Sequence, residues 1–276
     1  MKKRKQKPII YYNDEINDDF AGTKINTRRV GADFRFVHKN LLWRACSAFL
    51  YYLIAYPIVW FYERVILRVK VVNRGAMKHL KNTPGFIYGN HTGFIDAFTP
   101  NVLSLPYRRN RIIVGPDSVS IPGITGIVQM MGAIPLPTEL RGMRAFSRAV
   151  DYYHNSSNIT IYPEAHIWHY YCGVRPFSDA SFVYPVKYDA PVVAFFTAYS
   201  KPKGFLSFMR KANVTVYVSD PIYPDPSLTP KERQTALRDR VYEFMKEKSA
   251  LSDYEVIRYE KREERSAQPV REKQIS

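Results

Sequence analysis

The stretch YGNHTGFIDAF, residues 88–98, places a histidine and an aspartate five positions apart with no other charged residue around them. A carboxylate within reach of an imidazole fixes the ring tautomer and leaves the second nitrogen as a base near neutral pH. His91 and Asp96 are therefore candidates for the histidine–carboxylate half of a catalytic triad. The stretch holds no serine or cysteine, so we expect a substrate hydroxyl to be the nucleophile. Alone, such a pair is also common as a polar turn between buried segments.

The segments around this pair predict how it is positioned. A short buried strand, GFIYGN, runs into His91, and a helix-like segment follows it. In α/β folds the carboxyl ends of strands are where sites are built. Further strand and helix patterns alternate along residues 65–250, which predicts an α/β fold with a mostly parallel sheet flanked by helices. The expected strands are VILRVKVV, RIIVGP, NITIYPE, APVVAFFTAYS and NVTVYVSDPI.

Two helix starts carry recognisable signals. Thr138 is expected to cap a helix that begins at TELRGMRAF. Thr229 is expected to cap the helix TPKERQTALRDRVYEFMKEKSA, with Pro230 at its first position.

An uncharged, aromatic-rich stretch precedes this α/β region. Residues 45–62 carry no charge and approach the roughly 20 residues that cross a bilayer. Pro57 is expected to kink a helix here, and basic residues flank both ends. We predict a membrane-associated helix or hairpin over residues 41–64, which either spans the bilayer or lies in one leaflet. A buried core helix is the alternative.

Composition and charge point to the partners. The chain has 276 residues and a formal net charge of +16, which favours an anionic membrane surface. Nucleic acid is the other use of such a charge, but no nucleic-acid motif occurs, so we expect no nucleic-acid partner. Two distant cysteines suggest a reducing compartment. The basic start MKKRKQK is not followed by a hydrophobic stretch, so we expect no secretion signal. Residues 1–40 are expected to form an irregular basic arm, and residues 251–276 a charged, loose tail.

Four stretches together resemble the conserved blocks of the glycerolipid acyltransferase family, typified by 1-acylglycerol-3-phosphate acyltransferase. Residues 90–96 match its NHxxxxD block, and GIVQMMGAIPL, residues 126–136, is similar to the second block. IYPEA, residues 161–165, resembles the third block, and Pro191-Val192-Val193 the fourth. Their order and separations match as well, over roughly residues 65–220.

The resemblance implies an O-acyltransferase of phospholipid biosynthesis at the cytoplasmic face of the cell membrane. His91 would be the general base and Asp96 its orienting partner, with acyl-CoA or acyl carrier protein as donor and no metal or organic cofactor. The implied acceptor is a lysophospholipid, above all 1-acylglycerol-3-phosphate, which would give phosphatidic acid. Residues implied to bind substrate are Asn90, Thr92, Gly93 and Glu164.

Two departures from the family pattern concern the acceptor's phosphate. Thr138 stands where the second block has an arginine, and Ala165-His166-Ile167 replaces Gly-Thr-Arg in the third. Arginine suits phosphate because its planar fork bonds two oxygens at once. Candidate replacements are Arg141, Arg144 and Arg175, and His166 is a candidate for hydrogen bonding to the acceptor. A phosphate-free acceptor is the alternative, as is a non-catalytic lipid-binding protein on the same scaffold.

The stretch PEAHIWHYYC, residues 163–172, also invites a metal interpretation. Glu164, His166, His169 and Cys172 lie close in sequence, but their spacing matches no established zinc pattern. A metal-dependent hydrolase is thus the least favoured alternative, and we expect no metal.

Overall fold

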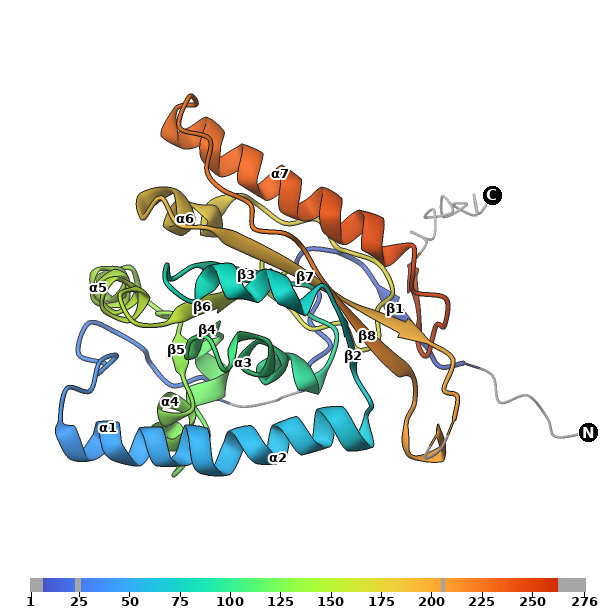
Figure 1. Cartoon of the computed structure of the whole chain (residues 1–276), viewed down its shortest axis with the longest axis horizontal. Coiled ribbons are helices and arrows are strands. Elements are labelled where there is room, and N and C mark those ends of the chain that lie inside the picture. The colour runs from blue at the N-terminus through green and yellow to red at the C-terminus, as the bar shows by residue number, and fades with distance from the viewer. Residues whose placement is uncertain (1–6, 23–25, 205–206, 263–276) are drawn as a thin grey trace, which may run out of the picture.

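A seven-stranded, mostly parallel sheet forms the centre of the protein (Figure 1). In this computed structural model, residues 7–22, 26–204 and 207–262 are described. The strand order is β2-β8-β7-β3-β6-β4-β5, and only β7 and β8 pair antiparallel. The expected α/β fold is therefore confirmed. The strands are β2 (Lys70–Val72), β3 (Phe86–Gly89), β4 (Asn110–Val114), β5 (Ala133–Pro135), β6 (Asn158–Ile161), β7 (Val192–Ser200) and β8 (Asn213–Val218).

Side-chain alternation along the strands builds two apolar layers, one on each face of the sheet. In β3, Phe86 and Tyr88 face one layer and Ile87 faces the other. Helices α5 (Met143–His154), α6 (Val183–Lys187) and α7 (Pro230–Ser249) contribute to the first layer. The second layer includes residues of the 3₁₀ helix Arg74–Leu80 and of α3 (Thr99–Ser104), on the face that looks toward the N-terminal helix in Figure 1.

The N-terminal apolar segment is one continuous helix, Leu41–Ile66. It combines α1 (Leu41–Ala48) and α2 (Tyr56–Phe61) with π-helical turns at Phe49–Ala55 and Tyr62–Ile66. Of the expected helix or hairpin, the structure shows the helix, which runs through Pro57. The wider turn before Pro57 accommodates a residue that has no N–H to donate. The alternative of a buried core helix is wrong, since only 11% of the most apolar 18-residue stretch of this helix is buried.

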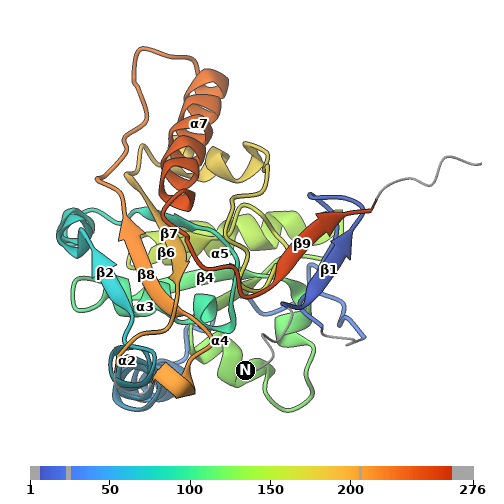
Figure 2. The ribbon, with the colours of Figure 1, turned by 90° about the vertical axis from the view of Figure 1, so that its right-hand side faces the viewer.

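This helix lies along the α/β domain and is attached to it at several points (Figures 1 and 2). The Ser47 hydroxyl donates to the Met130 carbonyl at 2.7 Å, at the end of α4 (Thr125–Met130). Further along, the Tyr51 hydroxyl donates to Asn101 Oδ1 on α3 at 2.9 Å. The helix thus has one face on the domain and an opposite face that is exposed.

The N-terminal arm is not wholly irregular. Its residues Ile9–Tyr12 form β1, which pairs in parallel with β9 (Arg258–Lys261) from the expected loose tail. Figure 2 shows the pair beside the main sheet. The ring of Trp168 packs against Tyr12 at 4.8 Å and against Tyr259 at 4.8 Å, which fixes both strands to the domain. The remaining tail, residues 263–276, lies outside the described residues.

Two local predictions were wrong. Val65 and Ile66 belong to the end of the long helix, so the strand expected at 65–72 begins only at Lys70. Thr138 does not cap α5, which begins at Met143 after a 3₁₀ turn; its hydroxyl instead accepts a hydrogen bond from the Val30 amide. Tertiary contacts with the arm thus override the local signal.

Thr229 caps α7 as predicted, in a reciprocal capping box with Glu232. We expect Thr229→Ala to lower the free energy of unfolding by about 1 kcal/mol, because the Glu232 amide in the first turn of the helix loses the hydroxyl that accepts from it. Urea unfolding followed by circular dichroism measures this change; an unaltered midpoint would contradict the assignment.

Candidate active site

The turn that carries the histidine is fixed at the carboxyl end of β3. Gly89 ends the strand, and a Cβ there would lie 2.1 Å from the Phe195 ring of β7, so no larger residue fits. Asn90 follows and is fully buried. Its side chain accepts from the Thr197 amide at 2.7 Å and donates to the Thr197 carbonyl at 3.2 Å. Asn90 therefore anchors the turn to β7, and its side-chain amide is not free to bind the lipid that accepts the acyl group.

His91 and Asp96 meet in the structure as the spacing predicts. His91 Nδ1 lies 3.0 Å from Asp96 Oδ2. The same oxygen accepts from the Thr92 amide at 2.5 Å and from the Gly93 amide at 2.8 Å. Because an ionised carboxylate only accepts, His91 Nδ1 carries the proton in this contact and Nε2 is left as the basic nitrogen.

The surroundings make this pair asymmetric. Asp96 is completely buried, whereas the His91 side chain is 24% exposed. The His91 ring stacks on Tyr162 at 4.5 Å, and the Tyr162 hydroxyl donates to the Asp96 carbonyl. His91 Nε2 makes no hydrogen bond to any residue that the structure describes. The imidazole is thus held on one side and open on the other.

A loop after β6 closes against the same turn. The Trp168 amide donates to the His91 carbonyl at 3.1 Å, and the Tyr170 amide to the Thr92 carbonyl at 2.7 Å. Thr92 is buried, and its hydroxyl lies 2.8 Å from the hydroxyl of Tyr199 on β7. Thr92 and Gly93 were expected to bind substrate, but their amides donate to Asp96 and the Thr92 hydroxyl pairs with Tyr199.

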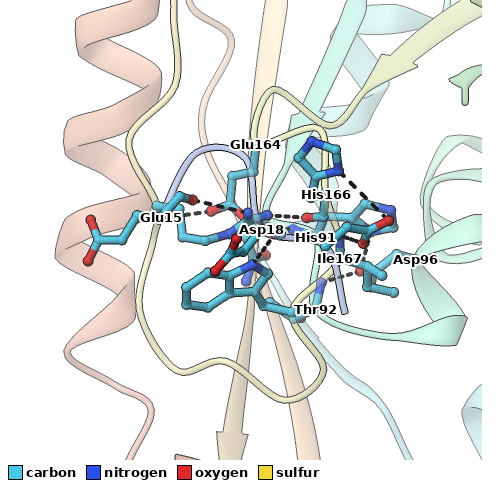
Figure 3. Close-up of polar contacts among 12 residues, drawn as sticks. Glu15, Asp18, His91, Thr92, Asp96, Glu164, His166 and Ile167 are labelled. Carbon is cyan, nitrogen blue, oxygen red and sulfur yellow. Dashed lines mark hydrogen bonds and ion pairs between the residues drawn. The ribbon is translucent and has the colours of Figure 1, made fainter. Parts of the chain in front are cut away.

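Glu164, on this loop, contacts the backbone of the histidine (Figure 3). One carboxylate oxygen accepts from the His91 amide at 3.2 Å and from Arg175 Nη2 at 3.3 Å, and the other from the Arg175 amide at 2.9 Å. Burial raises the pKa of Glu164, while the Arg175 guanidinium lowers it. All three partners donate, as an ionised carboxylate requires. Glu164 therefore supports the His91 backbone.

Arg175 cannot hold the acceptor's phosphate where the structure places it. It is 1% exposed, and its guanidinium donates to Glu164, to the His166 carbonyl and to the Glu15 carbonyl. It also lies 5.0 Å from the Trp168 ring centre. The prediction that Arg175 replaces a phosphate-binding arginine is corrected: the side chain neutralises Glu164 inside the protein.

The N-terminal arm supplies a group that the sequence did not reveal. The Ile167 amide donates to Asp19 Oδ1 at 3.3 Å, and His166 Nδ1 lies 3.8 Å from Asp19 Oδ2. The His166 side chain is 37% exposed. It thus remains available to an acceptor, beside an acidic group that comes from 147 residues earlier in the chain. No local pattern around Asp19 pointed to this contact.

Arg141 and Arg144 lie further away, on the same edge of the sheet. They follow β5, which is the third strand from β3 in the order β3-β6-β4-β5. At the usual spacing between strands, the ends of β3 and β5 are about 14 Å apart. Both arginines are exposed and form no ion pair with a described residue. They remain candidates for binding an anionic group near the site.

Three of the four side chains in the metal interpretation have partners of their own. Glu164 binds Arg175 and His166 lies beside Asp19, while Cys172 Sγ contacts backbone carbonyls. Within the described residues, no group of three or more histidine, cysteine, aspartate or glutamate side chains is arranged to hold a metal ion.

Comparisons with known proteins find a likeness in fold among solved structures. No protein-family model matches the chain, and no curated protein does either. Among solved structures, the protein is similar to the 1-acyl-sn-glycerophosphate (LPA) acyltransferase PlsC from Thermotoga maritima. The two are 18% identical, with a TM-score of 0.46, over 76% of this chain and 94% of that chain. At such low similarity, the function has to be inferred from the side chains of this protein.

The position of Arg175 gives a prediction that separates a structural from a phosphate-binding role. We expect Arg175→Ala to lower the free energy of unfolding by about 3–5 kcal/mol, because it leaves the Glu164 carboxylate buried and unpaired. Arg144→Ala, at an exposed position, should change it by less than about 0.5 kcal/mol. Chemical unfolding measures both. A stable Arg175→Ala protein that only binds its acceptor more weakly would contradict this role.

Proposed function

We propose that the protein is a membrane-associated O-acyltransferase that moves a fatty acyl group from a thioester to a hydroxyl of a glycerolipid. One observation carries this proposal: Asp96 holds the partly exposed His91 ring through Nδ1, and Nε2 has no hydrogen-bond partner among the described residues. A protein that only binds lipid has no need of this arrangement. The resemblance of the four sequence blocks to glycerolipid acyltransferases supports the same reaction.

The chemistry follows from the free nitrogen. His91 Nε2 takes the proton of the acceptor hydroxyl while the hydroxyl oxygen attacks the thioester carbonyl carbon. Buried Asp96 stabilises the imidazolium that forms. The tetrahedral intermediate collapses as the carbon–sulfur bond breaks, and the proton passes from His91 to the leaving thiolate. An ester and a free thiol result, and no metal or organic cofactor is needed beyond acyl-CoA or acyl carrier protein.

The backbone amides of the turn do not stabilise the negatively charged oxygen of the tetrahedral intermediate. Those of His91, Thr92 and Gly93 already donate to Glu164 and Asp96. Their role is to hold the catalytic pair rather than to bind the reacting carbonyl.

We propose 1-acylglycerol-3-phosphate as the acceptor, by the family resemblance, with phosphatidic acid as the product. Arg141 and Arg144 would then hold the phosphate, since Arg175 is enclosed. A phosphate-free lyso-lipid is the second candidate, favoured by that enclosure and by the side chains at positions 138 and 167. His166 would bind its headgroup by hydrogen bonds.

We propose that the long helix lies in one leaflet, at the cytoplasmic face of the cell membrane. It is attached to the domain from Ser47 to Glu63, and a helix bound in this way does not cross a bilayer while its domain stays in water. Its outer face exposes large apolar side chains, among them Leu42, Leu53 and Ile58, each more than 60% exposed. Phe208, on the loop between β7 and β8, is 84% exposed near the same helix, where Arg210 donates to the Leu67 carbonyl.

Acyl transfer by the purified protein tests the reaction and the acceptor together. Labelled acyl-CoA and acyl carrier protein would be offered with lysophosphatidic acid, glycerol 3-phosphate and phosphate-free lyso-lipids. Transfer to lysophosphatidic acid supports the first acceptor, and transfer only to phosphate-free lipids the second. Failure with every donor and acceptor, by a folded and membrane-bound protein, would favour the non-catalytic alternative.

His91→Ala should lower the transfer rate by at least about 10²–10⁴-fold, because it removes the general base. The exposed His79, on the 3₁₀ helix Arg74–Leu80, gives the matched control His79→Ala, which should retain the wild-type rate. A His91→Ala protein with substantial activity would contradict the mechanism.

Leu53→Ser combined with Ile58→Ser should weaken binding to vesicles that contain anionic lipid, because each substitution removes apolar area from the membrane-facing side. Flotation or sedimentation with the vesicles measures this. Leu251→Ser, at an exposed position after α7, is the control and should bind as the wild type does. Equal binding by all three proteins would contradict the proposed orientation.

A further inference from the structure

A carboxyl group is buried at the end of the apolar helix. Glu63 follows eighteen uncharged residues and is 2% exposed, although the side chains around it on the helix surface face outward. Two π-helical turns, Phe49–Ala55 and Tyr62–Ile66, widen the helix and shift its phase. The face that carries Ser47 and Tyr51 thereby also directs Glu63 toward the domain. Burying a carboxyl is costly unless it is bonded, so its partners decide its role.

Its hydrogen-bond partner is Thr99, at the start of α3. Thr99 Oγ1 lies 2.9 Å from Glu63 Oε1 and 3.1 Å from the carbonyl oxygen of Ile95. In both contacts the Thr99 hydroxyl is the donor, to Glu63 Oε1 and to the Ile95 carbonyl. Among the described residues no cation forms an ion pair with Glu63, so its burial favours the neutral acid.

The electrostatic surroundings also favour the neutral acid. Burial raises the pKa of Glu63 to about 7, and the nearby charge of Asp96 adds to this, whereas Thr99 and Arg64 lower it. The titratable groups that face Glu63 are Arg64 on its own helix, Asp96 on the 3₁₀ turn Phe94–Ala97, and Tyr162 after β6. The Arg64 guanidinium donates to the Val69 carbonyl and does not pair with Glu63.

The contacts from Glu63 through Thr99 to Ile95 end beside the catalytic pair. Ile95 immediately precedes Asp96, and Thr99 holds its carbonyl. The next carbonyl, of Asp96 itself, accepts from the Tyr162 hydroxyl. The short turn that carries Asp96 is therefore held from two sides, by Tyr162 of the α/β domain and by Glu63 of the apolar helix.

We propose that neutral Glu63 is a positioning residue that couples the seating of the apolar helix to the geometry of His91 and Asp96. Ionisation of Glu63 places a second negative charge beside Asp96, and the repulsion between the two carboxylates loosens the turn. This proposal rests on the proposed function, since the reaction is what the pair performs. It makes acyl transfer sensitive to pH at a residue that does not touch substrate.

The sign of the pH effect follows from the raised pKa. The unfolded chain ionises Glu63 near its ordinary value of 4.5, and the folded protein only at about 7. Stability from neutral Glu63 is therefore fully present below pH 4.5 and is lost as the pH rises through about 7.

The test compares acyl transfer by wild type, Glu63→Gln and Glu63→Leu on vesicles from pH 6 to 8.5. Glutamine keeps an oxygen that accepts from Thr99 and does not ionise, so the ratio of its rate to that of wild type should rise to about tenfold at pH 8. Glu63→Leu should be slower than Glu63→Gln at every pH, although it packs well on an apolar helix. Glu243→Gln, at an exposed position on α7, is the control and should follow wild type. A constant ratio for Glu63→Gln, or full activity of Glu63→Leu, would overturn the proposal.

A second measurement does not depend on turnover. The amides of Thr92 and Gly93 are bonded to Asp96, so their hydrogen exchange, corrected for intrinsic rate, reports the turn directly. Protection should fall in wild type above pH 7 and persist in Glu63→Gln. Unchanged protection in wild type would overturn the coupling even if acyl transfer occurs. If protection behaves as expected while no acyl group is transferred, the coupling is supported and the proposed reaction fails.

Discussion

The buried carboxylate of Asp96 is the constraint on which the site depends. One of its oxygens accepts from the His91 ring and from two consecutive backbone amides, so the turn after β3 is folded around a negative charge. Burying a carboxylate is costly, and these three donors to Oδ2 offset part of that cost. The contact with Asp96 Oδ2 therefore fixes the tautomer of His91 and leaves Nε2 without a hydrogen-bond partner among the described residues.

A second buried charge holds the opposite side of the histidine. Glu164 accepts from the His91 amide and is neutralised by Arg175, whose guanidinium also reaches carbonyls of the loop and of the N-terminal arm. Strands β1 and β9 cover this region through Trp168. Segments far apart in the sequence thus cooperate to hold one imidazole, and the arm is part of the site's support.

The sequence allowed prediction of features that depend on neighbouring residues. The buried run before His91, the capping signal at Thr229 and the five-residue spacing to Asp96 are local, and each gave a correct expectation. The pairing of β1 with β9 was missed because parallel pairing of remote segments leaves no local pattern. Arg175 was misread for a related reason: an arginine that neutralises a buried carboxylate looks in sequence like one that awaits a phosphate. Thr138 gave a sound local signal that contact with the arm overrides.

Nitrogen NMR of the protein with labelled histidine tests the central claim most directly, because it reports which nitrogen of His91 carries the proton. In the neutral ring, the account predicts a protonated Nδ1 and an unprotonated Nε2, with the preference lost in Asp96→Ala. A neutral His91 with its proton on Nε2 in the wild type would contradict it, since that nitrogen could not then accept the proton of an acceptor hydroxyl.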